Sequence, residues 1–585
     1  MFVISYEKQD GGYVLNSNVT ERTVPSDLVL SHDGSSFYVG CCFDAESEVL
    51  FSSGWEKNPS VLNTFCSALY IVHFDEFGCT FATDVSGREL LFYYRDETRF
   101  VLSDSFWGIL KIVRPSFDKV DAGIVAEMIA SGGGVPCDNS TPVKNLYWAP
   151  TNCIGRFDAE TGRFSFDIFA DTKRTCEVAS LDDAVESLDE SMVVMAQSLA
   201  SKHSDASFGL GLSGGLDSRI ALHYLEQVGI RPKSFNICVT RPHKIFLASS
   251  VLNARNLADA AHADYREVEW RPKSIREKMD AMLQYHPLGT CGHYTNAYKY
   301  EIEGIPEFDV LVTAGQAIGP NLVGGSVVSG MENMTEESVH DYLYTICTGD
   351  VRPYAYTEGL VRGKLGSMGV SSCQQGFGPH FDVWKAVVSD EVLSSIENRV
   401  SAFMESRYER GFTAADIVMD YRTSALGAIG RDGAYESLFG AKKSYTIYTP
   451  FLVKEGLRWD LSVVEGRRVL KELIKTKIPE FAHVGEESYG GIGRNSSRLM
   501  GSFEKLMFLL RGSGIMADEW YARHPAIRSA FVEDMSNDCA WFYEMFPDTS
   551  NFENVWRMSP SRMNSIWALK RLVDCIESKR YLAFD

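Results

Sequence analysis

The stretch Ser207–Glu226 decides the fold of the chain, and it reads SFGLGL, then SGGLDS, then RIALHYLE. The first run has the small and apolar residues of a short buried strand. Gly214 and Gly215 let the backbone turn sharply, and they leave no side chain in the way of a ligand. The stretch is therefore predicted to form a strand, a tight glycine turn and a helix.

The predicted turn has the features of an anion site. Asp217 and Ser218 fall in the first turn of the helix, where free N–H groups and the helix dipole favour negative charge. Ser213 and Ser218 add hydroxyl donors. A carboxylate at Asp217 fits beside phosphates only if a cation such as Mg²⁺ lies between them. An ordinary connection with two turn glycines would carry the same local pattern.

The turn is not a Walker loop, because it has no lysine and no G-x-x-x-x-G-K-[ST] pattern. It is similar to the SGG-x-DS loop of the ATP pyrophosphatases, which holds the outer phosphates of ATP and leaves the α-phosphate open to attack. That resemblance assigns ATP binding to Ser213, Gly214, Gly215, Leu216, Asp217 and Ser218, with Asp217 as the catalytic residue and the Mg²⁺ ligand. Arg219 follows as either a further phosphate contact or a solvated helix arginine.

The bulk composition limits the class of protein. The chain has 585 residues, 45% hydrophobic and 23% charged, which is typical of a soluble protein of roughly two to four domains. A formal charge of −21 argues against nucleic acid as a partner, because phosphate binding needs a basic surface. No apolar run reaches the length of a membrane span. The 13 scattered cysteines, without a C-x-x-C pair, favour a reducing cytoplasm.

Two regions differ in their patterns. Residues 1–170 contain short aromatic and β-branched runs between glycine and Asp/Asn turns, which predict a β-rich domain. Residues 171–585 begin with an amphipathic helix near 181–203, and strands at 231–239 and 308–316 then alternate with helices. This alternation predicts a parallel sheet with a helical C-terminal part, and ligands of such sheets bind at the carboxyl ends of the strands.

In this order of segments the chain resembles the asparagine synthetase family of the glutamine-hydrolysing type. GCTFATDVSGRELLFYYRDETRFVLSD resembles its Ntn-type amidotransferase domain, and SGGLDS, SFNICV, NARNLADAAHADYREV, VTAGQ and IYTPFL follow as in its synthetase domain. The resemblance implies that ATP and a carboxylate give an acyl-adenylate and pyrophosphate, and that an amine then displaces AMP. It also places adenine against Leu212, Ile237 and Gly315.

The first departure from the family is at the N-terminus. A glutaminase of this type needs an N-terminal cysteine at position 2, where its own amine serves as base, and this chain has Phe2. The family's asparagine–glycine–glutamate run is also missing. The front domain is therefore predicted to be a degenerate scaffold, as in β-lactam synthetases and lasso-peptide cyclases. The amine then comes from the substrate itself, from free ammonia or from a second substrate.

Two further departures affect the nucleotide site. The family's acidic S-G-E-G-S-D-E pattern is replaced at the positions Gln316, Gly319 and Pro320, so Asp217 is left as the loop carboxylate for metal. The family lysine that neutralises the α-phosphate falls on Gly485, and its loss would cost a few kcal/mol of barrier. Cations that could replace it are Lys442, Lys443, Arg431 and Arg494.

These patterns predict a cytoplasmic, ATP-dependent ligase that adenylates a carboxylate and forms an amide without its own glutaminase. The alternative is a nucleotide-binding protein of the same fold that has lost catalysis and acts through interaction. A tRNA-modifying enzyme is disfavoured by the acidic charge. The sequence does not identify the carboxylate or the amine, and it does not determine the oligomeric state. A homodimer is compatible with it.

Overall fold

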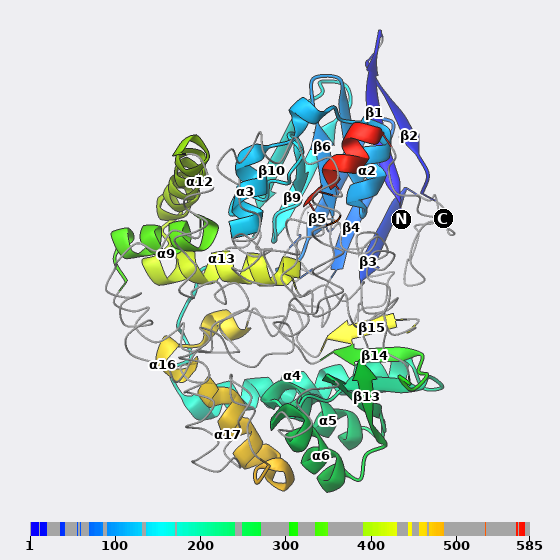
Figure 1. Cartoon of the computed structure of the whole chain (residues 1–585), viewed down its shortest axis with the longest axis vertical. Helices are drawn as coiled ribbons and strands as arrows, with labels where there is room; N and C mark the ends of the chain where they lie inside the picture. Colours follow the sequence, from blue (N-terminus) through cyan, green and yellow to red (C-terminus); the bar gives the residue numbers. More distant parts are fainter. Residues whose placement is uncertain are drawn as a thin grey trace.

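The structure is a computed structural model of the chain. Apart from a few single positions, it describes residues 2–10, 12–19, 35–40, 69–85, 91–130, 136–169, 172–239, 249–270, 304–313, 334–348, 390–429, 443–446, 455–464, 467–484, 569–570 and 572–579. Two antiparallel sheets form one end of the molecule, and a parallel sheet with its helices forms the other (Figure 1).

The antiparallel sheets are built from residues near the N-terminus, and each has five strands. The first sheet has the order β2 (Gly12–Ser17), β1 (Val3–Gln9), β7 (Arg99–Ser103), β6 (Phe92–Arg95), β8 (Leu146–Trp148). The second has the order β10 (Phe164–Ile168), β9 (Cys153–Asp158), β5 (Gly78–Thr83), β4 (Leu69–Asp75), β3 (Ser36–Gly40). Helices α2 (Phe106–Val113) and α3 (Ala122–Ala130) and the 3₁₀ helix η2 (Phe117–Lys119) follow β7 in the chain.

Aromatic side chains hold the two sheets together. The rings of Phe100 on β7 and Phe157 on β9 are stacked with their centroids 4.5 Å apart. Tyr6 on β1 is fully buried among them, and its hydroxyl donates to the main-chain oxygen of Asp75 at 2.8 Å. Because alternate residues of a strand face the same side, the aromatic runs of the sequence place one row of rings between the sheets.

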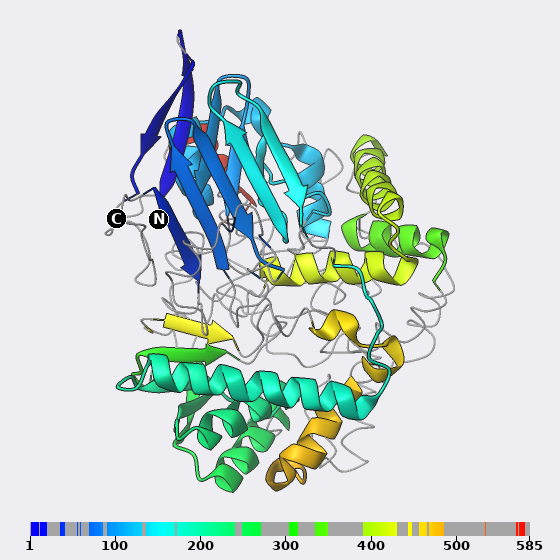
Figure 2. The same cartoon turned by 180° about the vertical axis from the view of Figure 1, so that it is seen from behind.

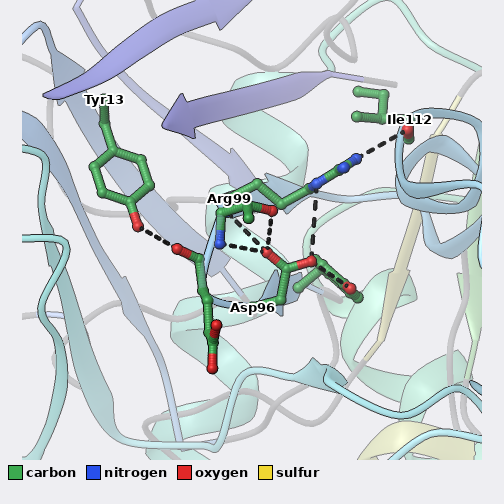
Figure 3. A network of polar contacts seen from close by, with 7 residues as sticks. Tyr13, Asp96, Arg99 and Ile112 are labelled. Atoms are coloured by element: carbon green, nitrogen blue, oxygen red, sulfur yellow. Dashed lines mark hydrogen bonds and ion pairs between the residues drawn. The ribbon is translucent and has the colours of Figure 1, made fainter. Parts of the chain in front are cut away.

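A polar network fixes the turn between β6 and β7 (Figure 3). The Asp96 carboxylate accepts from the main-chain N–H of Arg99 at 2.9 Å, which closes the turn. Arg99 Nη1 donates to the oxygen of Ile112 in α2 at 3.5 Å, and the Tyr13 hydroxyl of β2 donates to the oxygen of Glu97 at 3.3 Å. The turn therefore ties β2 and α2 to the same hairpin.

The parallel sheet has the strand order β13 (Tyr265–Trp270), β12 (Lys233–Val239), β11 (Phe208–Gly211), β14 (Val310–Thr313), β15 (Lys443–Thr446). Helix α5 (Leu216–Gln227) joins β11 to β12, and α6 (Ser249–Ala261) joins β12 to β13. The long helix α4 (Leu181–Lys202) packs with α5 and with α17 (Arg468–Lys477). β11 lies at the centre, and the chain continues from it to one side and returns at β14 on the other.

Helices from later in the chain pack against the front sandwich. Helices α9 (Glu336–Thr348) and α12 (Asp390–Glu409) pack on α3, where Arg399 Nη2 forms a 2.5 Å ion pair with the buried Glu127 carboxylate. Helix α13 (Ala414–Ile429) lies between the sandwich and the parallel sheet, and the segment leading to α4 passes beside it (Figure 2). The hydroxyl of Thr172 in this segment donates to the Asp420 carboxylate, and Arg407 Nε lies 3.1 Å from the other oxygen of that carboxylate.

The predicted fold class is confirmed: an antiparallel β sandwich precedes a parallel sheet flanked by helices. The division at residue 170 stays a prediction, because the last sandwich strand ends at Ile168 while α12 packs on α3 of the front part. Within the described residues, no helix is both long enough and apolar enough to cross a membrane.

Candidate functional site

The SGGLDS turn leaves the sheet at its central strand. Leu212 follows β11, is fully buried, and donates its main-chain N–H to the oxygen of Phe235 on β12 at 2.8 Å. Its own oxygen accepts from Asn236 Nδ2 at 2.6 Å. The chain turns to one side of β11 through α5 and to the other side at β14. The turn therefore lies at the topological switch point of a parallel sheet, where such folds have their ligand crevice.

The two serine hydroxyls shape the turn from within. Ser218 Oγ accepts from the main-chain N–H of Ser213 at 3.3 Å and lies 3.3 Å from the Ser213 hydroxyl. Ser213 Oγ in turn accepts from the main-chain N–H of Gly215 at 3.2 Å. Ser213 is exposed and Ser218 is buried. Only the outer hydroxyl therefore faces solvent, and a role for both as phosphate donors stays a prediction.

Gly214 is required by the packing of the turn. Its φ of +77° lies in the region that favours glycine. A β-carbon at this position would lie 2.6 Å from the Asn253 Cβ and 2.8 Å from the main-chain nitrogen of Ala254, both in α6. The turn thus lies directly against α6. The next residue, Gly215, has an extended backbone and precedes α5 without a side-chain cap.

Asp217 sits in the first turn of α5 and is partly exposed. Desolvation by the surrounding protein raises the pKa of its carboxyl to about 6, although the charge of Arg467 and its own main-chain N–H oppose the shift. A carboxylate whose ionised form is disfavoured by burial would be stabilised by a bound cation. Its position at the mouth of the turn is therefore compatible with the predicted metal ligand.

Arg467 is a charged residue of the site that the sequence analysis missed. It directly precedes α17 with a φ of +61°, and its positive charge acts on the Asp217 carboxylate. The surrounding sequence VVEGRRVL carries no signal for this role, because the effect of Arg467 on Asp217 depends on how α17 packs beside α5. Arg467 thus brings a cation to the same side of the turn as Asp217.

Arg219 is neither a solvated arginine nor an open phosphate contact, so both sequence-based alternatives are wrong. It is 1% exposed, and its Nη1 donates to the oxygens of Phe481 and Val484 at 3.0 Å each. Its Nη2 donates to the oxygen of Gly214 at 3.3 Å. Arg219 therefore joins the glycine turn to the segment around η7 (Pro479–Phe481).

Replacing Arg219 by methionine is expected to destabilise the protein by about 3 kcal/mol or more, because three buried hydrogen bonds from a charged donor are lost. Thermal unfolding measures this loss. The matched control is Arg255→Met on α6, whose ion pair with Glu267 is half-exposed and is worth at most about 1 kcal/mol. Equal losses in the two variants would contradict the structural role of Arg219.

The remaining predicted site residues are placed only in part. Ile237 lies on β12, where its main chain pairs with Val268 of β13, and its side chain is outside the described residues. Val484, held by Arg219, is the last described residue before the segment that contains Gly485. The predicted positions outside the described part are Gly315, Gln316, Gly319, Pro320, Arg431, Lys442, Gly485 and Arg494, together with the side chain of Lys443. Among the described residues, no group of three histidine, cysteine or acidic side chains forms a metal centre.

Comparisons with known proteins identify no family for the chain. No family model and no curated protein matches it. It is similar to the glutamine phosphoribosylpyrophosphate amidotransferase of B. subtilis solved with ADP and GMP, at 10% identity and a TM-score of 0.18, over 58% of this chain and 73% of that one. It is also similar to an allosteric regulatory enzyme of purine biosynthesis, at 9% identity and a TM-score of 0.17, over 57% and 72%. NAD⁺ synthetase from Burkholderia pseudomallei aligns at 13% identity and a TM-score of 0.16, over 41% and 94%.

Proposed function

We propose that the protein is an ATP-dependent, AMP-forming ligase that activates a carboxylate and forms an amide. The observation that carries the proposal is the SGGLDS turn at the switch point of the parallel sheet, with Asp217 at the start of α5. A helix N-terminus behind two glycines offers main-chain N–H groups to the outer phosphates of ATP. The α-phosphate is then left open to a nucleophile.

The residues of the turn fit ATP and Mg²⁺. Gly214 and Gly215 bring main chain rather than side chains to the mouth of the turn, and Ser213 is exposed there. Asp217 would hold the cation, since burial disfavours the ionised form of its carboxyl and a bound cation would stabilise that form. The bound Mg²⁺ would neutralise negative charge on the phosphates. Adenine would lie beside the buried Leu212, as the family resemblance implies.

In the proposed reaction a substrate carboxylate oxygen attacks the α-phosphorus of ATP. The bond to the β-phosphate oxygen breaks, and pyrophosphate leaves with the electron pair. An amine then attacks the acyl carbon, AMP leaves, and the amine gives up a proton. Arg467 would supply positive charge near the phosphates in place of the family's lysine, and the effect of its charge on Asp217 supports this role.

Pyrophosphate exchange tests the proposal. Labelled pyrophosphate is expected to enter ATP only when a suitable carboxylate from a panel of amino acids, sugar acids and peptides is present. The variant Asp217→Asn serves as the matched control and is expected to show no exchange. Tight ATP binding without exchange for any carboxylate would reject the ligase and favour the alternative, a nucleotide-binding protein without catalysis. That alternative is motivated by the sequence, which has Gln316, Gly319 and Pro320 in place of the family's acidic pattern, Gly485 in place of its lysine and Phe2 in place of its cysteine.

We further propose that the front sandwich does not hydrolyse glutamine, so that the amine comes from ammonia or from a substrate. The Phe2 side chain is fully buried, with its ring centroid 4.9 Å from that of Phe37. Its main-chain N–H donates to the Asp104 carboxylate at 2.9 Å. Position 2 is therefore occupied by a core side chain, and a nucleophile placed there would replace core packing.

Replacing Phe2 by cysteine is expected to cost about 2–4 kcal/mol of stability and to create no glutaminase, because a large buried ring is lost. Glutamate release from glutamine and thermal unfolding measure the two effects. Phe77→Cys is the matched control, since that ring is 73% exposed and its loss should change stability little. Glutamate release by the unaltered protein would contradict the prediction.

A further inference from the structure

Asn253 on α6 is a buried polar residue that the proposed site does not yet use. Its side chain is 1% exposed, and within the described part of the chain its Nδ2 has no hydrogen-bond partner. Leaving a buried amide donor unpaired is unfavourable, because the donor loses its hydrogen bonds to water and gains none in the protein. A residue that persists at this cost deserves a functional explanation, and its position supplies one.

The Asn253 side chain lies against the glycine turn. Its Cβ would be 2.6 Å from a β-carbon on Gly214, so only a residue without a side chain fits between the turn and α6. The amide nitrogen is two bonds from this Cβ, so it lies within a short side chain's length of the turn. Asn236 offers a comparison within the same site, because its Nδ2 is already committed to the Leu212 oxygen at 2.6 Å. Of these two buried asparagine amides, that of Asn253 on α6 has an unpaired donor.

We propose that Asn253 is an additional ligand of the nucleotide, with its amide donating to an oxygen of the pyrophosphate portion. This inference rests on the proposed function. A donor beside uncapped main-chain N–H groups calls for a ligand that only accepts hydrogen bonds, and the oxygens of a di- or triphosphate meet that requirement. Asn253 would thus bind the outer phosphates from the α6 side of the turn.

Two substitutions test the role. Asn253→Leu keeps the branching of the side chain and removes the polar atoms, and Asn253→Ala keeps the helix and removes the amide. Both are expected to weaken binding of ATP and of free pyrophosphate by about 10- to 100-fold while leaving AMP binding unchanged. Titration calorimetry with each of the three ligands gives these values.

The stability of the unliganded protein provides an independent readout. Asn253→Leu should unfold at the same or a higher temperature than the unaltered protein, because an unpaired buried donor is removed. The matched control Asn236→Leu should unfold at a lower temperature, because it loses a hydrogen bond at the end of β11. A lower unfolding temperature for Asn253→Leu, or unchanged affinity for ATP and pyrophosphate, would overturn the role of Asn253 alone. If the unaltered protein binds neither ligand, the proposed function fails as well.

Discussion

Replacing Asp217 by asparagine is expected to make the unliganded protein more stable while strongly weakening its binding of ATP with Mg²⁺. The carboxyl lies in an environment that raises its pKa from 3.8 to about 6, so the folded protein pays for ionising it at neutral pH. This shift corresponds to at most about 3 kcal/mol, because one pKa unit equals about 1.4 kcal/mol. An uncharged amide of the same shape avoids this cost.

The sign of the effect depends on pH. Above about pH 6 the Asp217 carboxyl is ionised in both the folded and the unfolded protein, and the full penalty is present. Between pH 6 and 3.8 the folded protein takes up the proton first, and the penalty disappears. Asp217→Asn should therefore unfold several degrees above the unaltered protein at pH 7.5, and at the same temperature near pH 3.5, if both remain folded there.

Ligand binding should change in the opposite direction to stability. Loss of the proposed metal ligand is expected to weaken binding of ATP with Mg²⁺ by at least about 100-fold, since even residues behind a metal ligand matter by 10- to 100-fold. The matched control is Asp183→Asn in the exposed first turn of α4, which should lower stability slightly and leave ATP binding unchanged. A variant at Asp217 that binds ATP with unaltered affinity would remove the basis of the proposed function.

The sequence pattern was sufficient to predict the secondary structure and the sheet that surround the site. Strand, glycine turn and helix follow from local periodicity and from the two glycines, and alternation of strands and helices predicts the parallel sheet. Aromatic runs between turns predicted a β-rich front region, and the resemblance to the amidotransferase domain implied its sandwich form. These features are local in the chain, which is why a single sequence carries them.

The partners of the turn depend on tertiary packing and could not be predicted. Arg219 contacts oxygens more than 260 positions away, and its neighbours in the sequence are the same as those of a solvated helix arginine. The effect of Arg467 on Asp217 and the burial of Asn253 arise from α17 and α6, whose own patterns indicate only amphipathic helices. The charges and donors that adjust the site therefore come from helices that the motif does not include.

Gly214→Ala is expected to destabilise the protein by about 4 kcal/mol or more and to abolish ATP binding. A φ of +77° costs about 1–3 kcal/mol for a residue with a side chain. The added methyl would also lie 2.8 Å from the Ala254 nitrogen and 2.9 Å from the Asn253 carbonyl carbon, which are main-chain atoms of a helix and cannot rotate away. Either the turn or α6 must move, and both belong to the proposed phosphate site.

Gly211→Ala is the matched control, because a β-carbon there meets no atom within 4 Å. Thermal unfolding and ATP titration on both variants separate the need for glycine at the turn from a general sensitivity of β11 to substitution. If Gly214→Ala folds and binds ATP like the unaltered protein, the turn does not hold phosphates through its main chain. If only Gly214→Ala loses binding, and residual folded protein still fails to bind at low temperature, the loss lies in the geometry of the turn. Reduced stability would not explain this loss of ATP binding, because the protein that remains folded would also fail to bind.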